Sequence, residues 1–177
     1  MIEIHESTIS SPFPGTIVDI ETIGNFDLTY AGYDLKRYRN IRQVILGYIT
    51  SDSLDIYCCE SESEIKPLAL KTKALLFELA KPFYAFNCDF EKKIWQVHGF
   101  ILHNMEELQC KDQFGFETKA QAVEGLGIPQ YDDPFDDNGL LAADAWSKGD
   151  FSAAIAHNRS CLLKERDIAI MRYLKGR

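Results

Sequence analysis

Two carboxylates, Asp19 and Glu21, stand within an apolar and largely β-branched run at residues 15–22. Side chains alternate between the two faces of a strand, so these two would share one face, about 7 Å apart at Cα. Like charges this close raise each other's pKa unless a cation lies between them, and carboxylate oxygens suit Mg²⁺ or Mn²⁺. The spacing predicts a divalent metal site. The alternative is an edge strand whose polar face is solvated.

A second polar turn, at residues 87–91, follows the apolar segment at residues 83–86. The apolar segment is typical of a strand, and the turn leads into a helical pattern that ends before Gly99. Ligands of open α/β sheets gather at the carboxyl ends of the strands. We therefore expect this turn to meet Asp19 and Glu21 at one site.

These two segments resemble the DEDD (DnaQ-like) 3'-5' exonucleases, which share the ribonuclease H-like fold. Residues 19–22, DIET, are similar to the first exonuclease motif. Residues 87–91, NCDFE, resemble the second motif, N-x-x-F-D, with Glu91 in place of the usual Asp. The resemblance extends in order over residues 16–174.

The third motif of this family pairs a Tyr or His with an Asp on the last helix, and residues 156–163, AHNRSCLL, are the candidate. His157 stands in the Tyr or His place, and Cys161 or, with the longer spacing, Leu162 stands in the Asp place. Asp167 would face about 120° to 240° away from either at ~100° per residue. The motif therefore lacks its carboxylate, and a thiol is a poor ligand for Mg²⁺.

The resemblance implies hydrolysis of phosphodiester bonds with two divalent ions, Mg²⁺ or Mn²⁺. Asp19 would bridge both ions, and Glu21 would hold the ion near the nucleophile. Glu91 would reach the second ion directly or through water. His157 would orient or deprotonate the attacking water.

The resemblance also assigns Thr22, Asn87 and Phe90 to substrate binding, with single-stranded 3' ends of nucleic acid as the expected substrate. From the residues alone, helix capping by Asn87 and core packing by Phe90 are the alternatives. Because the third motif is incomplete, a catalytically weakened domain that binds nucleic acid ends or a protein partner is the competing hypothesis. A third is an enzyme that acts on a small nucleotide.

The composition of the chain limits the classes of protein to which it can belong. The chain has 177 residues, 46% of them hydrophobic, which predicts a single domain over residues 1–177. A net charge of -8 argues against a generic nucleic-acid coating protein, although basic residues cluster at 36–42 and 159–177. Five cysteines without a C-x-x-C pair disfavour disulfides, and the start of the chain lacks signal-peptide character. We expect a cytoplasmic protein without a membrane span.

The periodicity predicts an α/β fold, a mixed sheet flanked by helices. The resemblance implies that this sheet is ribonuclease H-like, with five strands, three antiparallel and then two parallel. Strands are expected at residues 15–22, 43–49, 55–59, 83–86 and 105–110. Helices are expected at residues 63–80, 90–97, 118–126, 139–146, 151–157 and 161–174. The aspartates of residues 131–139 lack the pattern of a calcium loop, and most are interpreted as turn and cap residues.

Overall fold

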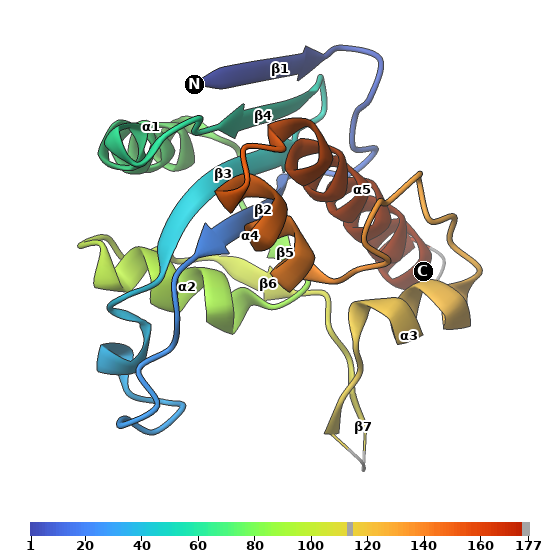
Figure 1. Cartoon of the computed structure of the whole chain (residues 1–177). Helices are drawn as coiled ribbons and strands as arrows, with labels where there is room; N and C mark the ends of the chain where they lie inside the picture. Colours follow the sequence, from blue (N-terminus) through green and yellow to red (C-terminus); the bar gives the residue numbers. More distant parts are fainter. Residues whose placement is uncertain (113–114, 175–177) are drawn as a thin grey trace.

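A computed structural model describes residues 1–112 and 115–174, and it is an α/β structure built on a mixed sheet of six strands (Figure 1). The order across the sheet is β1-β4-β3-β2-β5-β6. The first four of these strands pair antiparallel, whereas β2, β5 and β6 run parallel. The strands are β1 (Ile2–Glu6), β2 (Thr16–Ile23), β3 (Arg42–Ile49), β4 (Leu54–Cys58), β5 (Phe83–Ala85) and β6 (Met105–Glu107). A separate pair joins β7 (Lys111–Asp112) to β8 (Gly115–Phe116).

The expected number of five strands is wrong, because the N-terminal segment also forms a strand. Ile2 and Ile4 alternate with the exposed Glu3 and His5, a two-residue period that gives β1 one half-buried face. This strand adds antiparallel to the outer side of β4. The five predicted strands begin within one residue of their expected positions, but β6 ends at Glu107, before the expected residue 110.

The central strand β2 is buried on both faces, with Thr22 as its only half-buried residue. It lies between β3 and β5, so the alternative of a solvated edge strand is excluded. Asp19 and Glu21 are therefore 7% exposed, although each carries an ionisable carboxylate. Such burial requires partners for both groups.

Helices cover both faces of the sheet. α5 and α4 pack against β2 (Figure 1), while α1 packs against β3 and α2 against β5 and β6. The helices are α1 (Ile65–Glu78), α2 (Cys88–Val97), α3 (Lys119–Leu126), α4 (Gly139–Ser147) and α5 (Phe151–Ala169), with short helical turns at η1 (Leu35–Tyr38), η2 (Glu62–Glu64) and η3 (Ile170–Leu174). Among the described residues, no helix is long and apolar enough to cross a membrane.

The prediction of two separate helices at 151–157 and 161–174 is wrong, because α5 runs without a break over Phe151–Ala169 and continues into η3. The intervening Asn158 and Ser160 are weak helix formers. Both are fully buried, with side chains bonded to Asp19 and to the carbonyl of Gln130. These tertiary contacts outweigh the local propensity.

Gly47 on β3 allows α5 to lie close to the sheet. A Cβ atom at this position would be 2.2 Å from Asn158 Oδ1 and 2.6 Å from Leu162 Cδ1, both on α5. Gly47 also pairs directly with Asp19 on β2. The missing side chain therefore leaves the space through which Asn158 reaches Asp19.

Replacing Gly47 with Ala should destabilise the fold, because the new methyl group would overlap the Asn158 and Leu162 side chains of α5, which would have to move. We expect a loss of about 1–3 kcal/mol in the free energy of unfolding, measured by urea denaturation. Gly125→Ala in α3 is the matched control, since no atom lies within 4 Å of its Cβ position, and it should be neutral or stabilising. Equal stability of the two variants would contradict the close approach of α5.

Candidate metal centre and active site

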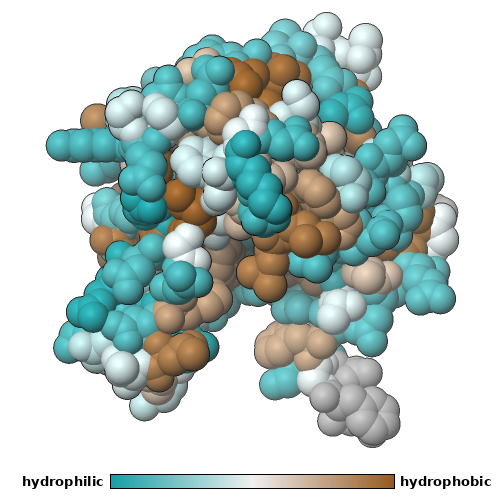
Figure 2. All heavy atoms as spheres, viewed as in Figure 1, coloured by the Kyte–Doolittle hydropathy of each residue, from teal (hydrophilic) through white to brown (hydrophobic). Residues whose placement is uncertain are grey.

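A cavity of about 530 Å³ opens at the carboxyl end of β2. Its walls come from β2, α2, α4, α5 and the first residue of α3. Figure 2 shows hydrophobic side chains over α4 and a hollow beneath them, and the exposed apolar residues there are Leu140 and Leu141. The ionisable residues that line the cavity are Asp19, Glu21, Glu91, Lys119, Asp137, His157 and Cys161.

Asp19 stands at the centre of the polar contacts. Its Oδ2 accepts a hydrogen bond from Asn158 Nδ2 at 2.7 Å, and its Oδ1 lies 3.4 Å from Lys119 Nζ. Lys119 begins α3, where Thr118 and Gln121 form a capping box that fixes the start of the helix. Two segments distant in the sequence thus meet at one carboxylate of β2.

Glu165 is the carboxylate that the third-motif alignment did not find. It lies one helical turn after Cys161 on α5, is 1% exposed, and accepts a hydrogen bond from Lys119 Nζ at 2.7 Å. Lys119 therefore joins Glu165 to Asp19. The two aligned positions, Cys161 and Leu162, carry no carboxylate, but Glu165 supplies one a turn further along α5. Asp167 is bonded elsewhere, to Tyr131 and Arg166.

Buried acids at this site hold their protons more tightly than free ones. Burial and the neighbouring Asp19 raise the pKa of Glu21 well above its usual value. Burial, Glu165 and Asp19 raise the pKa of Glu91 in the same way. Burial and Asp19 also raise the pKa of Glu165 to about 8, although Lys119 opposes this shift. A cation bound near these carboxylates would lower all three raised pKa values.

The site fits divalent cations, because three of its buried carboxylate oxygens, Asp137 Oδ2 among them, form no hydrogen bond with the described residues. The other two are Glu91 Oε2 and Glu165 Oε2. A buried acceptor without a donor costs about 1–3 kcal/mol, which a bound cation would recover. Glu91 enters the site from the first turn of α2.

His157 is fixed by a chain of buried contacts. Its Nδ1 lies 2.7 Å from Asp133 Oδ1, and Asp133 Oδ2 accepts a hydrogen bond from Lys164 Nζ at 2.8 Å. Burial raises the pKa of Asp133, but the hydrogen bonds from His157 and Lys164 outweigh burial and hold it below its usual value. An ionised Asp133 makes Nδ1 the protonated nitrogen, so Nε2 faces the cavity as an acceptor.

The predicted substrate-binding residues separate into two groups. Thr22 and Phe90 line the cavity, whereas Asn87 is not among its lining residues. The Asn87 side chain accepts a hydrogen bond from the backbone of Phe90 and caps α2, as its alternative interpretation predicted. Cys161 also lines the cavity, and burial raises the pKa of its thiol well above the usual value.

The predicted residues Asp19, Glu21, Glu91 and His157 all reach the cavity. Sequence reasoning missed three residues that contact them, Lys119, Asp133 and Asn158. It also missed Glu165, which bonds to Lys119, and Lys164, which bonds to Asp133. Glu165 could have been found, because positions 157, 161 and 165 fall on one helix face at a spacing of four. Lys119 gave no such signal. Its position depends on how α3 packs on α5.

Comparison of the chain with protein-family models, with curated proteins and with solved structures gave no match.

Lys119→Met should tighten divalent metal binding, because the Lys119 ammonium stands between Asp19 and Glu165 and competes with a cation. We expect the Kd for Mn²⁺ to fall about tenfold, corresponding to about 1.4 kcal/mol, when measured by isothermal titration calorimetry. Without metal the variant should melt at a lower temperature, since it leaves buried carboxylates unpaired.

The matched control is Lys148→Met, because Lys148 is 71% exposed and pairs with Asp144 on the surface. This change should leave both Mn²⁺ affinity and melting temperature almost unaltered. If Lys119→Met bound Mn²⁺ no more tightly than Lys148→Met, competition by the Lys119 ammonium would be excluded.

Proposed function

We propose that this chain is a metal-dependent 3'-5' exonuclease with a ribonuclease H-like fold, which hydrolyses phosphodiester bonds of nucleic acid. The observation that carries the proposal is the convergence of buried carboxylates from β2, α2 and α5 around Asp19. The order of β4, β3, β2, β5 and β6, three antiparallel and then two parallel strands, supports the fold part of the proposal.

Mg²⁺ or Mn²⁺ would be held by Asp19, Glu21 and Glu91, with Glu165 as a further acceptor behind Lys119. Bound there, such ions activate water and stabilise the leaving oxygen of a phosphodiester. Asp19 is the best candidate for a ligand shared between ions, because contacts from α3 and α5 both reach it.

His157 would act on the attacking water through Nε2, which faces the cavity. Asp133 orients the imidazole by accepting from Nδ1, and it stabilises the imidazolium that forms when Nε2 takes a proton. Lys164 holds Asp133 in place from the other side. This arrangement supports His157 as a general base, one of the two roles that the resemblance implied for it.

The rim of the cavity supports a nucleic acid substrate. Phe26, which is 41% exposed, and Phe90 both line the cavity, with ring centroids 6.5 Å apart. The guanidinium of Arg37 lies 5.3 Å from the Phe26 ring and forms no ion pair with the described residues. Phe26 is exposed and Phe90 is half-buried, and the Arg37 guanidinium also donates a hydrogen bond to the Tyr30 carbonyl. Aromatic rings beside such a cation suit the stacking of unpaired bases.

Most other basic side chains are already paired with acids, which limits their part in binding. The described ion pairs of the two basic clusters include Arg39–Asp27, Arg42–Glu62, Arg159–Glu6, Arg166–Asp167 and Arg172–Glu117. Lys175 and Arg177 lie outside the described residues. Binding should therefore depend on the cavity and its rim more than on a broad basic surface.

A second candidate function is a catalytically weakened domain that binds nucleic acid ends or a protein partner. The position of Lys119 Nζ favours it, because an ammonium contacting Asp19 and Glu165 can replace one divalent cation. In that case the aromatic rim would still bind ends, but hydrolysis would stay low at any metal concentration.

Asp19→Asn should abolish metal-dependent hydrolysis while preserving the fold. We expect a loss of at least about 100-fold, corresponding to about 2.7 kcal/mol, in the rate of shortening of 5'-labelled single-stranded DNA or RNA with Mn²⁺. The melting temperature should stay equal or rise slightly, since a repelling charge is removed. Asp89→Asn is the control, because Asp89 is 70% exposed on α2 and should keep full activity. Full activity of Asp19→Asn would overturn the site.

A comparison of linear and circular substrates tests whether the proposed reaction starts from a free end. A linear single strand should be shortened from its 3' end, whereas a circular strand of the same sequence should stay intact, because the cavity would accept a free end. Gel analysis of matched linear and circular substrates measures the difference. A duplex should react more slowly, since its end must first be unpaired. Equal cleavage of the two single strands would refute exonuclease action.

A further inference from the structure

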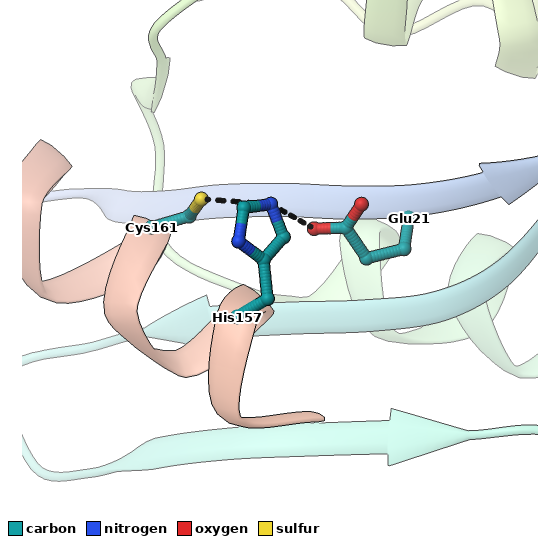
Figure 3. A group of neighbouring side chains, drawn as sticks. All are labelled: Glu21, His157 and Cys161. Atoms are coloured by element: carbon teal, nitrogen blue, oxygen red, sulfur yellow. Dashed lines mark hydrogen bonds and ion pairs between the residues drawn. The ribbon is translucent and has the colours of Figure 1, made fainter. Parts of the chain in front are cut away.

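Three side chains that offer different kinds of metal-binding atom lie beside the buried carboxylates. Glu21, His157 and Cys161 offer a carboxylate oxygen, an imidazole nitrogen and a sulfur atom, and all three side chains line the cavity. Figure 3 shows the His157 ring between the other two side chains, with Glu21 coming from β2 and both partners from α5. Mg²⁺ prefers oxygen ligands, whereas imidazole and thiolate suit Zn²⁺.

The distances between the donor atoms are close to those of a zinc site. His157 Nε2 lies 3.8 Å from Glu21 Oε1 and 3.7 Å from Cys161 Sγ, and no ligand atom of the group is more than 4.8 Å from another. In a tetrahedral site, with Zn–N of about 2.0–2.1 Å and Zn–S of about 2.3 Å, such atoms are about 3.4–3.6 Å apart. A small rotation of the Glu21 side chain would close the triangle.

The contacts behind His157 also match a zinc ligand. Histidine ligands commonly donate their other ring N–H to a carboxylate, which fixes the ring and raises its basicity. Asp133 occupies that place at 2.7 Å from Nδ1, with its side chain fully buried. The imidazole is therefore oriented with Nε2 toward Glu21 and Cys161 before any metal binds.

A neighbouring group, Asp133, Asp137 and Cys161, is a poorer candidate. Lys164 Nζ contacts both aspartates at 2.8 Å, so their charge is already balanced by a buried ammonium. No lysine or arginine forms an ion pair with Glu21 among the described residues. A cation would therefore be favoured beside Glu21 and not beside Lys164.

We propose that Glu21, His157 and Cys161 form a Zn²⁺ site, with Asp133 as the residue that positions His157. Three protein ligands leave a fourth position, and it would face the cavity, as in sites where zinc holds a water or substrate. Because Glu21 also belongs to the predicted Mg²⁺ or Mn²⁺ ligands, Zn²⁺ would compete for that carboxylate. The zinc site does not rest on the proposed function, since it requires neither nucleic acid nor hydrolysis.

Cobalt(II) is the probe, because it enters tetrahedral zinc sites and a thiolate ligand gives it a charge-transfer absorption band. The full chain with Cys110→Ser serves as the reference protein, since Cys110 is the exposed cysteine. Titration should give this band with one equivalent of Co²⁺, and added Zn²⁺ should remove it, because zinc binds more tightly than cobalt.

Variants in the reference protein identify the ligands. Cys161→Ser should lose the band and bind Zn²⁺ at least tenfold more weakly, whereas Cys58→Ser, at another buried cysteine, should keep both properties. Asp133→Asn should keep the band and lower Zn²⁺ affinity about 10- to 100-fold. His157→Gln provides a second ligand variant if Cys161→Ser fails to fold, and it should weaken binding similarly.

Two results would overturn the proposal. One is the absence of the band in the reference protein at stoichiometric Co²⁺. The other is a band of unchanged intensity in folded Cys161→Ser or His157→Gln. Neither result bears on hydrolysis with Mn²⁺, so failure of the zinc site and failure of the proposed exonuclease are distinguishable.

Discussion

The close approach of α5 to the sheet at Gly47 is the constraint on which the site depends. Gly47 lies opposite Asp19 in the β2–β3 pairing, and Asn158 of α5 occupies the space above it. This contact sets both the height and the rotation of α5 over β2. The helix face that carries His157, Cys161 and Glu165 consequently lies over the two carboxylates of the central strand.

Buried charge is balanced by two lysines, each of which ties a separate segment to α5. Lys119 brings the start of α3 to Asp19 and Glu165, and Lys164 holds the loop that carries Asp133. Burying a lysine is costly unless its charge is paired and bonded, and both ammonium groups meet that condition. The same pairs that stabilise these segments also determine the charge available to a metal at Asp19.

Glu21 stands between two kinds of donors. The carboxylate oxygens of Asp19 and Glu91 favour hard cations. On the side of α5, the neighbouring donor atoms are the nitrogen of His157 and the sulfur of Cys161. One carboxylate can thus serve metals of different chemistry. The choice between them would depend on metal availability and on the position of Lys119.

Local patterns in the sequence are enough to predict most strands, most helices and the first carboxylates. Apolar β-branched runs and helical periodicity are local signals, and the pair Asp19 and Glu21 needed only the two-residue period of a strand to be recognised. The strand at Ile2–Glu6 was missed because its alternation is short and half-exposed. The break predicted inside α5 was wrong because local propensity ignored the burial of Asn158 and Ser160.

The other charges of the site are brought there by long-range packing. Lys119 lies 100 residues from Asp19 along the chain, and Asp133 lies in a loop whose aspartates were interpreted mainly as turn residues. Their positions follow from how α3 and the loop pack on α5, which no local pattern encodes. For Glu165, the sequence predicts the helix face on which the residue lies, but it does not predict the contact with Lys119. Long-range packing sets these charges in place because buried ions must find partners wherever the fold brings them together.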